Sequence, residues 1–249
     1  IECLTRFRKK SEQNEILQRL GAGRVDILIG THRILQSDIK FRDLGLLVID
    51  EEQRFGVLHK ERLKDFRTAV DILTLTATPI PRTLRMGLLG LRDLSVINTP
   101  PPARLAVRTY VYQFEDRIIK EALDRELDRG GQVFFVHPRV ETIEATGRYL
   151  RRLVPGLRLA IAHGQMSEKE LHNAMMGFLK KKFDVLLCTT IIENGLDIPN
   201  ANTILVNRAE IFGLAQLYQL RGRVGRSDLQ AYAYFLVQAG RNLTESARQ

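Results

Sequence analysis

The hydrophobic residues of this chain gather in short runs that are separated by longer amphipathic stretches. The runs cover residues 25–30, 44–50, 70–77, 133–136, 157–162, 184–190 and 203–207. They are too uniformly apolar for half-exposed strands, and such runs are typical of strands that are buried on both faces. The stretches between them, about 10 to 20 residues long, have room for crossover helices. The pattern therefore predicts an α/β fold built on parallel sheets.

Four stretches have the periodicity of helices, namely residues 11–20, 114–129, 141–153 and 167–180. Ser11 is expected to cap the first of them, since a serine side chain accepts hydrogen bonds from the open backbone N–H groups of a first turn. Ser167 is expected to cap the last, and Glu170 three positions on completes a capping box.

Three consecutive prolines at 100–102 divide the chain into two blocks, each of which alternates strands and helices. Proline lacks a backbone N–H and fits neither a helix interior nor a central strand. We therefore expect one domain over residues 1–99, a proline-rich linker over 100–104 and a second domain over 105–249.

Composition narrows the class of protein. The chain has 249 residues, 44% of them hydrophobic, which suffices for one large core or two modest ones. It contains no apolar run near the roughly 18 residues of a membrane span and no signal peptide, so we expect a cytoplasmic protein. Cys3 and Cys188 are expected to be buried thiols, because their spacing supports neither a disulfide framework nor a zinc site. The net charge of +9 favours an anionic partner such as a nucleic-acid backbone.

Two adjacent acids, Asp50 and Glu51, stand at the end of the apolar run 44–50. In open α/β sheets, ligands bind beyond the carboxyl ends of the strands. There one carboxylate can hold Mg²⁺, and the next can orient and deprotonate the water that attacks a terminal phosphate. A solvated acidic turn is the alternative for these two residues taken alone.

Short polar side chains follow other predicted strands. Thr76 and Thr78 stand at the end of the run 70–77, where hydroxyls can link an acidic site to a neighbouring lobe. Gly195 allows a ligand to approach the backbone closely, and Asp197 can accept a hydrogen bond from a ribose hydroxyl or an arginine. Each segment, taken alone, is also compatible with an ordinary turn.

Four further polar residues at strand ends can bind phosphate oxygens of a nucleic acid without reading its bases; they are Thr31, His32, Thr189 and Thr190. Satisfied loop groups are an equal alternative for all four.

The segment QLRGRVGR covers residues 219–226. If the preceding helix continues through it, Gln219, Arg223 and Arg226 fall at i, i+4 and i+7 on one face. Two guanidinium groups directed at one place suit a polyphosphate, and an arginine finger accelerates phosphoryl transfer by roughly 10³ to 10⁵. A solvated basic helix end is the alternative, and the repeated Gly-Arg spacing disfavours it.

In this order, the segments resemble the motifs of superfamily 2 helicases. GTHRIL is similar to motif Ib, DEEQ to motif II, TATP to motif III, TTIIENGLDIPNANT to motif V and QLRGRVGR to motif VI. The longer stretches DEEQRFGV, TATPIPRTL, HGQM and GLAQLYQLRGRVGR are similar to the branch that contains bacterial transcription-repair coupling factors and RecG fork-remodelling helicases. Gln165, where RecG proteins tend to carry arginine, favours the coupling-factor family.

The resemblance implies two RecA-like parallel-sheet lobes, the first incomplete at its N-terminus, and a motor that uses ATP and Mg²⁺. Asp50 would coordinate magnesium through water, Glu51 would be the general base, and Thr76 and Thr78 would link hydrolysis to lobe movement. The residues expected to reach the ATP phosphates are Gln219, Arg223 and Arg226. Those expected to face the nucleotide are Gly195 and Asp197. Those expected along the DNA backbone are Thr31, His32, His163, Gly164 and Thr190.

The phosphate-binding loop GxxxxGK[ST] does not occur among the 249 residues. The family places this loop before the segment that residue 1 begins, so we expect the chain to belong to a longer protein and to be inactive alone.

For that longer protein the resemblance implies an ATP-dependent double-stranded DNA translocase, which couples the removal of stalled RNA polymerase to nucleotide-excision repair. RNA polymerase and excision-repair proteins would then be partners bound through other domains. A RecG-like fork-remodelling helicase and a non-catalytic DNA-binding scaffold are the alternatives.

Overall fold

The chain folds into two compact units, Ile1–Leu94 and Ser95–Gln249, which we describe separately. The structure is a computed structural model, and it describes residues 1–5, 8–52, 55–56, 70–76, 93, 95–97, 99, 105–193 and 198–238. The expected linker at 100–104 lies outside the described residues, so the proposed domain boundaries remain a prediction.

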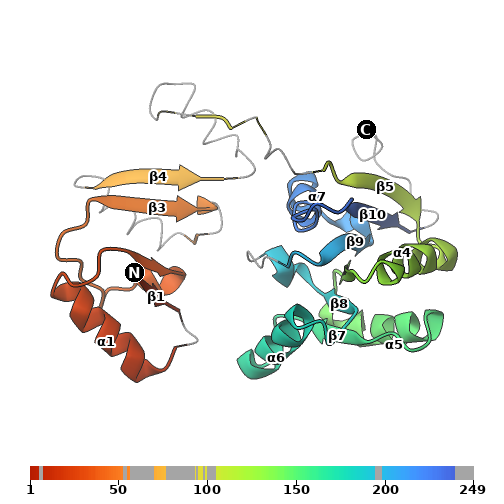
Figure 1. Cartoon of the computed structure of the whole chain (residues 1–249), viewed down its shortest axis with the longest axis horizontal. Helices are drawn as coiled ribbons and strands as arrows, with labels where there is room; N and C mark the ends of the chain where they lie inside the picture. Colours follow the sequence, from red (N-terminus) through yellow and green to blue (C-terminus); the bar gives the residue numbers. More distant parts are fainter. Residues whose placement is uncertain are drawn as a thin grey trace. The chain divides into compact units, whose positions relative to one another are not determined.

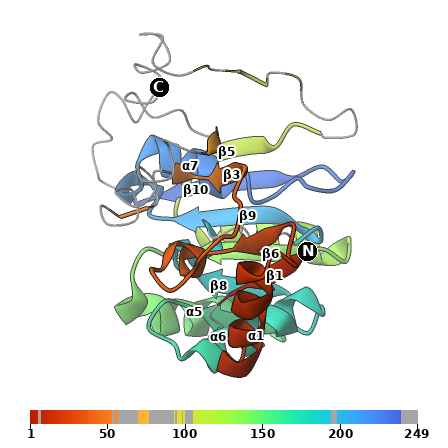
Figure 2. The same cartoon turned by 90° about the vertical axis from the view of Figure 1, so that its left-hand side faces the viewer.

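The first unit contains two separate pairs of parallel strands and one α-helix among its described residues. The elements are β1 (Glu2–Leu4), α1 (Lys10–Gly21), β2 (Leu28–Gly30), the 3-10 helix η1 (His32–Leu35), β3 (Leu46–Asp50) and β4 (Asp71–Leu75). β1 pairs with β2, and β3 pairs with β4. Helix α1 lies beside β1 (Figure 2), and its Ile16 and Leu20 form a buried cluster with Leu4 and Ile39.

The apolar strands of this unit are less buried than the sequence predicts. Leu46 is 57% exposed, Val48 51% and Leu73 50%. The expectation that such runs are covered on both faces is therefore wrong for β3 and β4 in this structure. Among the described residues, this sheet has two strands, so each strand has a neighbour on one edge only. Of the residues in these two strands, only Ile49 is buried.

Helix α1 begins one residue earlier than the sequence predicts. Lys9 is its N-cap, with φ −58° and ψ 147°, so Ser11 already lies in the first turn. No side chain caps this end. The expectation that Ser11 caps the helix is wrong, because the chain enters helical conformation before its hydroxyl can reach a free N–H.

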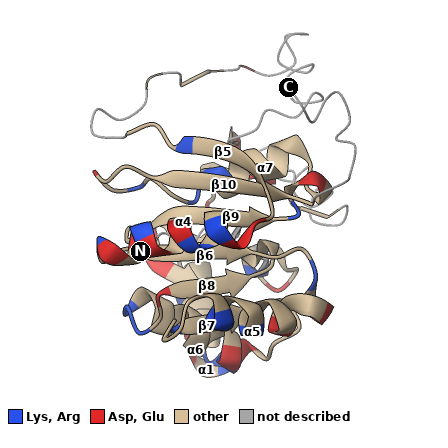
Figure 3. Ribbon diagram, turned by 90° about the vertical axis from the view of Figure 1, so that its right-hand side faces the viewer, with Lys and Arg blue, Asp and Glu red and all other residues tan. Residues whose placement is uncertain are grey.

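The second unit is built on one six-stranded sheet in which all pairings are parallel. Its strands are β5 (Arg108–Gln113), β6 (Gln132–Val136), β7 (Leu159–Ala162), β8 (Val185–Cys188), β9 (Ala201–Asn207) and β10 (Tyr232–Val237). Its helices are α4 (Asp116–Asp128), α5 (Ile143–Leu153), α6 (Glu168–Leu179) and α7 (Leu214–Arg221), with the 3-10 helices η3 (Val140–Thr142), η4 (Thr190–Glu193) and η5 (Ala209–Ile211). The strand order β5-β10-β9-β6-β8-β7 is visible in Figure 3.

The direction of each crossover decides which face its helix covers. The connections through α4 and α5 step towards the β7 edge, and those through α6 and α7 step back towards the β5 edge. Because crossovers between parallel strands are right-handed, opposite steps place helices on opposite faces. Figure 1 shows α4 and α5 on one side of the sheet and α6 and α7 on the other, and the buried residues form a separate cluster on each side.

The central strands of this sheet are covered on both faces, as the sequence predicts. Every residue of β6, β8 and β9 is buried. Two strands of this sheet, β5 and β10, lie outside the predicted apolar runs, as does β1 of the first unit. β5 is an edge strand with the composition RTYVYQ. Five of its six residues are exposed, and its sequence lacks a continuous apolar run.

The two cysteines differ in burial. Cys188 lies in the core, where burial raises the pKa of its thiol, whereas Cys3 is exposed. The expectation of two buried thiols is therefore wrong for Cys3, because alternate residues of the short strand β1 face opposite sides and Leu4 takes the buried one.

Helix α6 begins with the predicted capping box. The Ser167 hydroxyl accepts from the backbone N–H of Glu170 at 3.3 Å, and the Glu170 carboxylate accepts from the backbone N–H of Ser167 at 3.0 Å. Among the described helices, none is long and apolar enough to cross a membrane.

Replacement of Ser167 by alanine should lower the free energy of unfolding by about 1 kcal/mol, because the backbone N–H of Glu170 loses the hydroxyl that accepts from it. Urea denaturation followed by circular dichroism measures the change. Ser11→Ala is the control: it should alter stability by less than about 0.5 kcal/mol, since Ser11 caps nothing. Equal losses in both variants would contradict this assignment.

Candidate functional site

The carboxyl ends of β3 and β4 bring the first group of predicted residues together. Asp50 ends β3 opposite Leu75, the last residue of β4, and the backbone N–H of Glu51 donates to the carbonyl of Leu75 at 2.9 Å. Thr76 directly follows Leu75 and is exposed. The parallel pairing therefore places Asp50, Glu51 and Thr76 at one edge, while Thr78 lies outside the described residues.

Glu51 has an unusual backbone conformation. Its φ is 54°, in the left-handed region that residues other than glycine, asparagine and aspartate seldom adopt. Such residues gather at functional sites, where the surrounding structure holds them. Here the hydrogen bond to Leu75 holds the turn, so the chain leaves the sheet sharply between the two carboxylates.

This edge suits a magnesium ion that is shared with a nucleotide. Asp50 presents an exposed carboxylate at the strand end, and Glu51 is partly exposed beside it. The described residues contain no cluster of three metal-binding side chains. Mg²⁺ in nucleotide sites is held by one or two carboxylates together with phosphate oxygens and water, so one or two protein carboxylates fit its needs.

The other predicted residue pair of the first unit stands at the end of β2. Thr31 is exposed, and its carbonyl accepts from the backbone N–H of Ile34 as η1 begins. His32 is the first residue of η1. Both follow the carboxyl end of β2, as the sequence predicts.

In the second unit, three predicted nucleic-acid contacts also follow strand ends. His163 comes directly after β7, and Gly164 next to it is exposed. The backbone N–H of Met166 donates to the His163 carbonyl at 3.2 Å, which forms a tight turn before Ser167. Thr190 begins η4 after β8. Gly195 and Asp197 lie outside the described residues.

The arginine segment differs from its predicted helical geometry. Helix α7 ends at Arg221 with Gly222 as its C-cap, so Gln219 lies on the helix but Arg223 and Arg226 do not. The prediction that Gln219, Arg223 and Arg226 lie on one face of a continuous helix is therefore wrong. Gly225 has φ 76°, and only a residue without a Cβ adopts this conformation readily, so the chain turns between the two arginines.

Burial anchors this turn instead of a helix. Leu220 and Val224 are fully buried on either side of it. The backbone N–H of Arg223 donates to the Leu220 carbonyl at 3.0 Å. A Cβ on Gly225 would lie 3.0 Å from Val107 and 3.2 Å from Ala231, so the backbone packs closely there.

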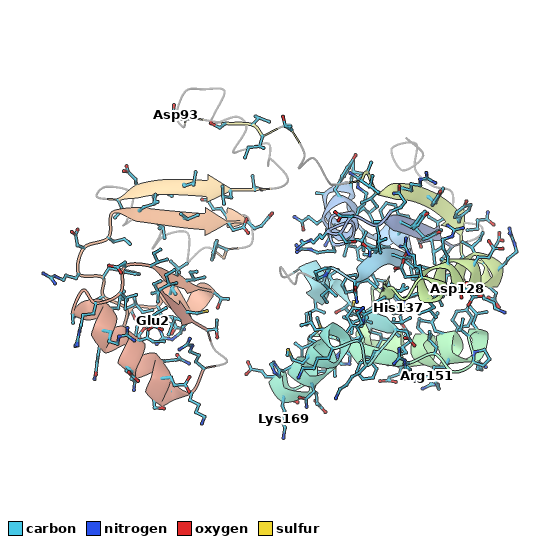
Figure 4. The ribbon with its side chains drawn as sticks, viewed as in Figure 1. Glu2, Asp93, Asp128, His137, Arg151 and Lys169 are labelled. Atoms are coloured by element: carbon cyan, nitrogen blue, oxygen red, sulfur yellow. The ribbon has the colours of Figure 1, made fainter. Side chains whose placement is uncertain are left out.

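A buried polar group at this edge was missed by the sequence analysis. His137, labelled in Figure 4, directly follows β6. Asn207 ends β9, and each of the two residues is 5% exposed. Their side chains meet at 3.0 Å between His137 Nδ1 and Asn207 Nδ2. His137 Nε2 lies 2.7 Å from the Thr142 hydroxyl. The sequence did contain a signal for this pair. Like Asp50, His137 and Asn207 are each the first polar residue after an apolar run.

The surroundings of His137 favour its neutral form. Burial lowers the pKa of this imidazole below its ordinary value of 6.5, and the positive charges of Arg208 and Arg139 lower it further. Because Asn207 donates from its amide nitrogen, His137 Nδ1 carries no proton, and Nε2–H donates to Thr142.

Two protein-family models match the chain. The family described as DEAD/DEAH box helicase matches residues 2–86, and the helicase conserved C-terminal domain matches residues 116–228. The predicted α/β fold of RecA-like lobes on parallel sheets is confirmed by these matches.

Curated relatives are similar over the whole chain. The transcription-repair-coupling factor of Escherichia coli (strain K12) is 57% identical and that of Myxococcus xanthus 56%, each over 249 residues. These alignments cover 100% of this chain but 22% and 21% of the relatives, so the chain spans about a fifth of their length. A solved structure of RecG bound to a three-way DNA junction matches with a TM-score of 0.74 and 37% identity, over 99% of this chain and 32% of that one.

The lowered pKa of His137 should make the second unit less stable in acid. Between this pKa and 6.5 the unfolded chain binds more protons than the folded one, so the free energy of unfolding falls as the pH drops through this window. The slope is at most about 1.4 kcal/mol per pH unit. Urea denaturation at several pH values should show a smaller slope in His137→Gln than in the wild type. Equal slopes in the two proteins would contradict this role.

Proposed function

This chain belongs to the superfamily 2 helicases, and we propose that it forms part of the ATP-driven motor of a double-stranded DNA translocase. The observation that carries the proposal is the parallel pairing of β3 and β4, which brings Asp50, Glu51 and Thr76 to one edge. Two adjacent carboxylates at a strand end are the groups that nucleotide hydrolysis requires.

We assign the hydrolytic step to the first unit. Asp50 would hold Mg²⁺ through water, and the bound ion would supply positive charge beside the ATP phosphates. Glu51 accepts a proton from the attacking water, for which its partly exposed carboxylate beside Asp50 is suited. Thr76 and Thr78 transmit the state of this site to movement between the lobes.

We assign the stabilisation of phosphate charge to residues after β9. Gln219 on α7 and the two arginines of the following turn, Arg223 and Arg226, act on the ATP phosphates. Arginine suits this role because its planar guanidinium binds phosphate oxygens with two hydrogen bonds. Gly195 and Asp197 are proposed to face the nucleotide.

The nucleic-acid track is proposed to follow the strand ends of both units. Thr31, His32, His163, Gly164 and Thr190 lie there and offer N–H and O–H donors to phosphates, which gives binding without base specificity. The similarity to RecG bound to a DNA junction supports DNA as the ligand. The net charge of +9 agrees with a polyanionic partner.

For the longer protein, we propose that the motor removes stalled RNA polymerase and thereby directs nucleotide-excision repair to the lesion. Identities of 56–57% with coupling factors over all 249 residues support this assignment. A RecG-like fork remodeller is the second candidate, supported by 37% identity with the solved RecG structure. Displacement of a stalled polymerase by the longer protein, without regression of model forks, would decide for the first.

Glu51→Gln in the longer protein should leave ATP binding intact and lower DNA-stimulated phosphate release at least about 100-fold, because the amide cannot accept the water's proton. Equilibrium ATP binding and steady-state hydrolysis measure the two effects. Glu52→Gln is the matched control and should stay within about threefold of wild type. The 249-residue chain by itself should hydrolyse ATP negligibly, because it lacks the GxxxxGK[ST] loop. Full turnover by Glu51→Gln would overturn the assignment.

Arg226→Ala in the longer protein should reduce turnover by roughly 10³-fold or more, a cost of about 4 kcal/mol in the barrier. Steady-state kinetics with saturating DNA measures it. Arg221→Ala provides the comparison, because Arg221 lies at the end of α7 over the ring of Tyr218, 4.7 Å away, and should change turnover little. Equal effects of the two substitutions would remove the specific role of Arg226.

A further inference from the structure

The connection between β9 and α7 is short and is held by backbone hydrogen bonds. Arg208 follows Asn207 in the left-handed conformation, with φ 54° and ψ 50°. The backbone N–H of Ile211 donates to the Arg208 carbonyl at 3.0 Å, and that of Phe212 donates to the Ala209 carbonyl at 3.1 Å. Gly213 then caps α7. The position of the end of β9 therefore sets where α7 begins.

The helix in turn determines where the arginine turn lies; we use this name for residues 222–226. The backbone N–H of Gly222 donates to the Tyr218 carbonyl at 3.0 Å, and that of Val224 donates to the Arg221 carbonyl at 3.3 Å. Leu220 and Val224 are fully buried in the same hydrophobic cluster. The arginine turn and α7 thus pack as one body against the sheet.

The end of β9 is held by His137, which follows the neighbouring strand β6. The Asn207 amide donates to His137 Nδ1 at 3.0 Å, and His137 Nε2 contacts the Thr142 hydroxyl at 2.7 Å. Thr142 is the N-cap residue of α5. Asn207 therefore ties the start of the connection to the loop after β6 and to α5.

The same connection contains buried polar atoms that are not satisfied. Within the described part of the chain, no hydrogen-bond partner exists for Asn207 Oδ1, Arg208 Nε or either carboxylate oxygen of Glu210. Arg208 Nε lies 3.8 Å from the Glu210 carboxylate, beyond a hydrogen bond. Folded proteins retain few such atoms, and each calls for an explanation. The hydrogen bond between Asn207 and His137, in contrast, is formed, and it ties this connection to the loop after β6.

We propose that His137 and Asn207 are positioning residues that hold the arginine turn in its active place. This inference rests on the proposed role of Arg223 and Arg226 in ATP hydrolysis. Both side chains are buried, and we assign them no contact with the nucleotide. Each acts through the connection from β9 to α7.

The test uses Asn207→Leu in the longer protein, since leucine has a similar volume and cannot donate to His137. DNA-stimulated kcat should fall about 10- to 100-fold, while the KM for ATP stays within about threefold and the melting temperature within a few degrees. This split is expected because a misplaced arginine loses transition-state contacts and leaves ground-state binding in place.

Asn207→Asp is the conservative variant. Its carboxylate accepts from a protonated Nδ1, so the link is restored with the opposite direction of donation. Turnover should return to within about threefold of wild type. In wild type, protonation of His137 puts a donor opposite the Asn207 amide, so turnover should fall at acid pH. Asn207→Asp should lose this acid limb, with Arg208 and Arg139 as the charged groups near His137 in both proteins.

Wild-type kcat in Asn207→Leu would overturn the inference. So would a loss of turnover in Asn207→Leu that Asn207→Asp does not restore. If Asn207→Leu fails to fold, the pH profile of Asn207→Asp decides, and an acid limb identical to that of wild type counts against the proposal. Failure of the proposed function looks different, because the wild-type protein would then show no DNA-stimulated hydrolysis at all.

Discussion

Parallel strand pairing is the constraint on which the rest of this structure depends. When neighbouring strands run in the same direction, the residues that follow them emerge at one edge of the sheet. Asp50 and Thr76 meet in this way in the first unit. In the second unit, His137 and His163 follow two strands of one sheet, and Asn207 is the last residue of a third. Residues that are distant in sequence thus come together because their strands are paired.

Burial of both sheet faces has a second consequence for the polar residues at the sheet edges. At the edge where β6 begins, the Gln132 amide donates to the carbonyls of Phe178 and Phe183, each at 2.7 Å, and ties the end of α6 and the loop before β8 to the core. At the opposite edge, His137 and Asn207 pair with each other. Buried polar groups must find partners because water cannot reach them. The first network joins α6 and a loop to the sheet, and the second joins the loop after β6 to the connection that leads to the arginine turn.

The arginine turn shows how the fold can present charge without a helix face. Glycines at 222 and 225 end α7 and turn the chain, while Leu220 and Val224 anchor it by burial. Long cationic side chains on either side of a buried residue can project from a fixed backbone. Their placement then depends on what holds the backbone, which is the connection from β9 through η5.

The sequence by itself determined the features that depend on neighbouring residues. Continuous apolar runs predicted β6, β8 and β9, the Ser167 capping box predicted the start of α6, and the ordered motifs predicted the superfamily. The tertiary structure alone decided which runs are covered, since β3 and β4 share the apolar character of β6 but remain half exposed. It also decided that α7 ends before Arg223, and that His137 meets Asn207 seventy residues away. These outcomes depend on contacts between distant segments, and the local pattern of polar and apolar residues carries no information about such contacts.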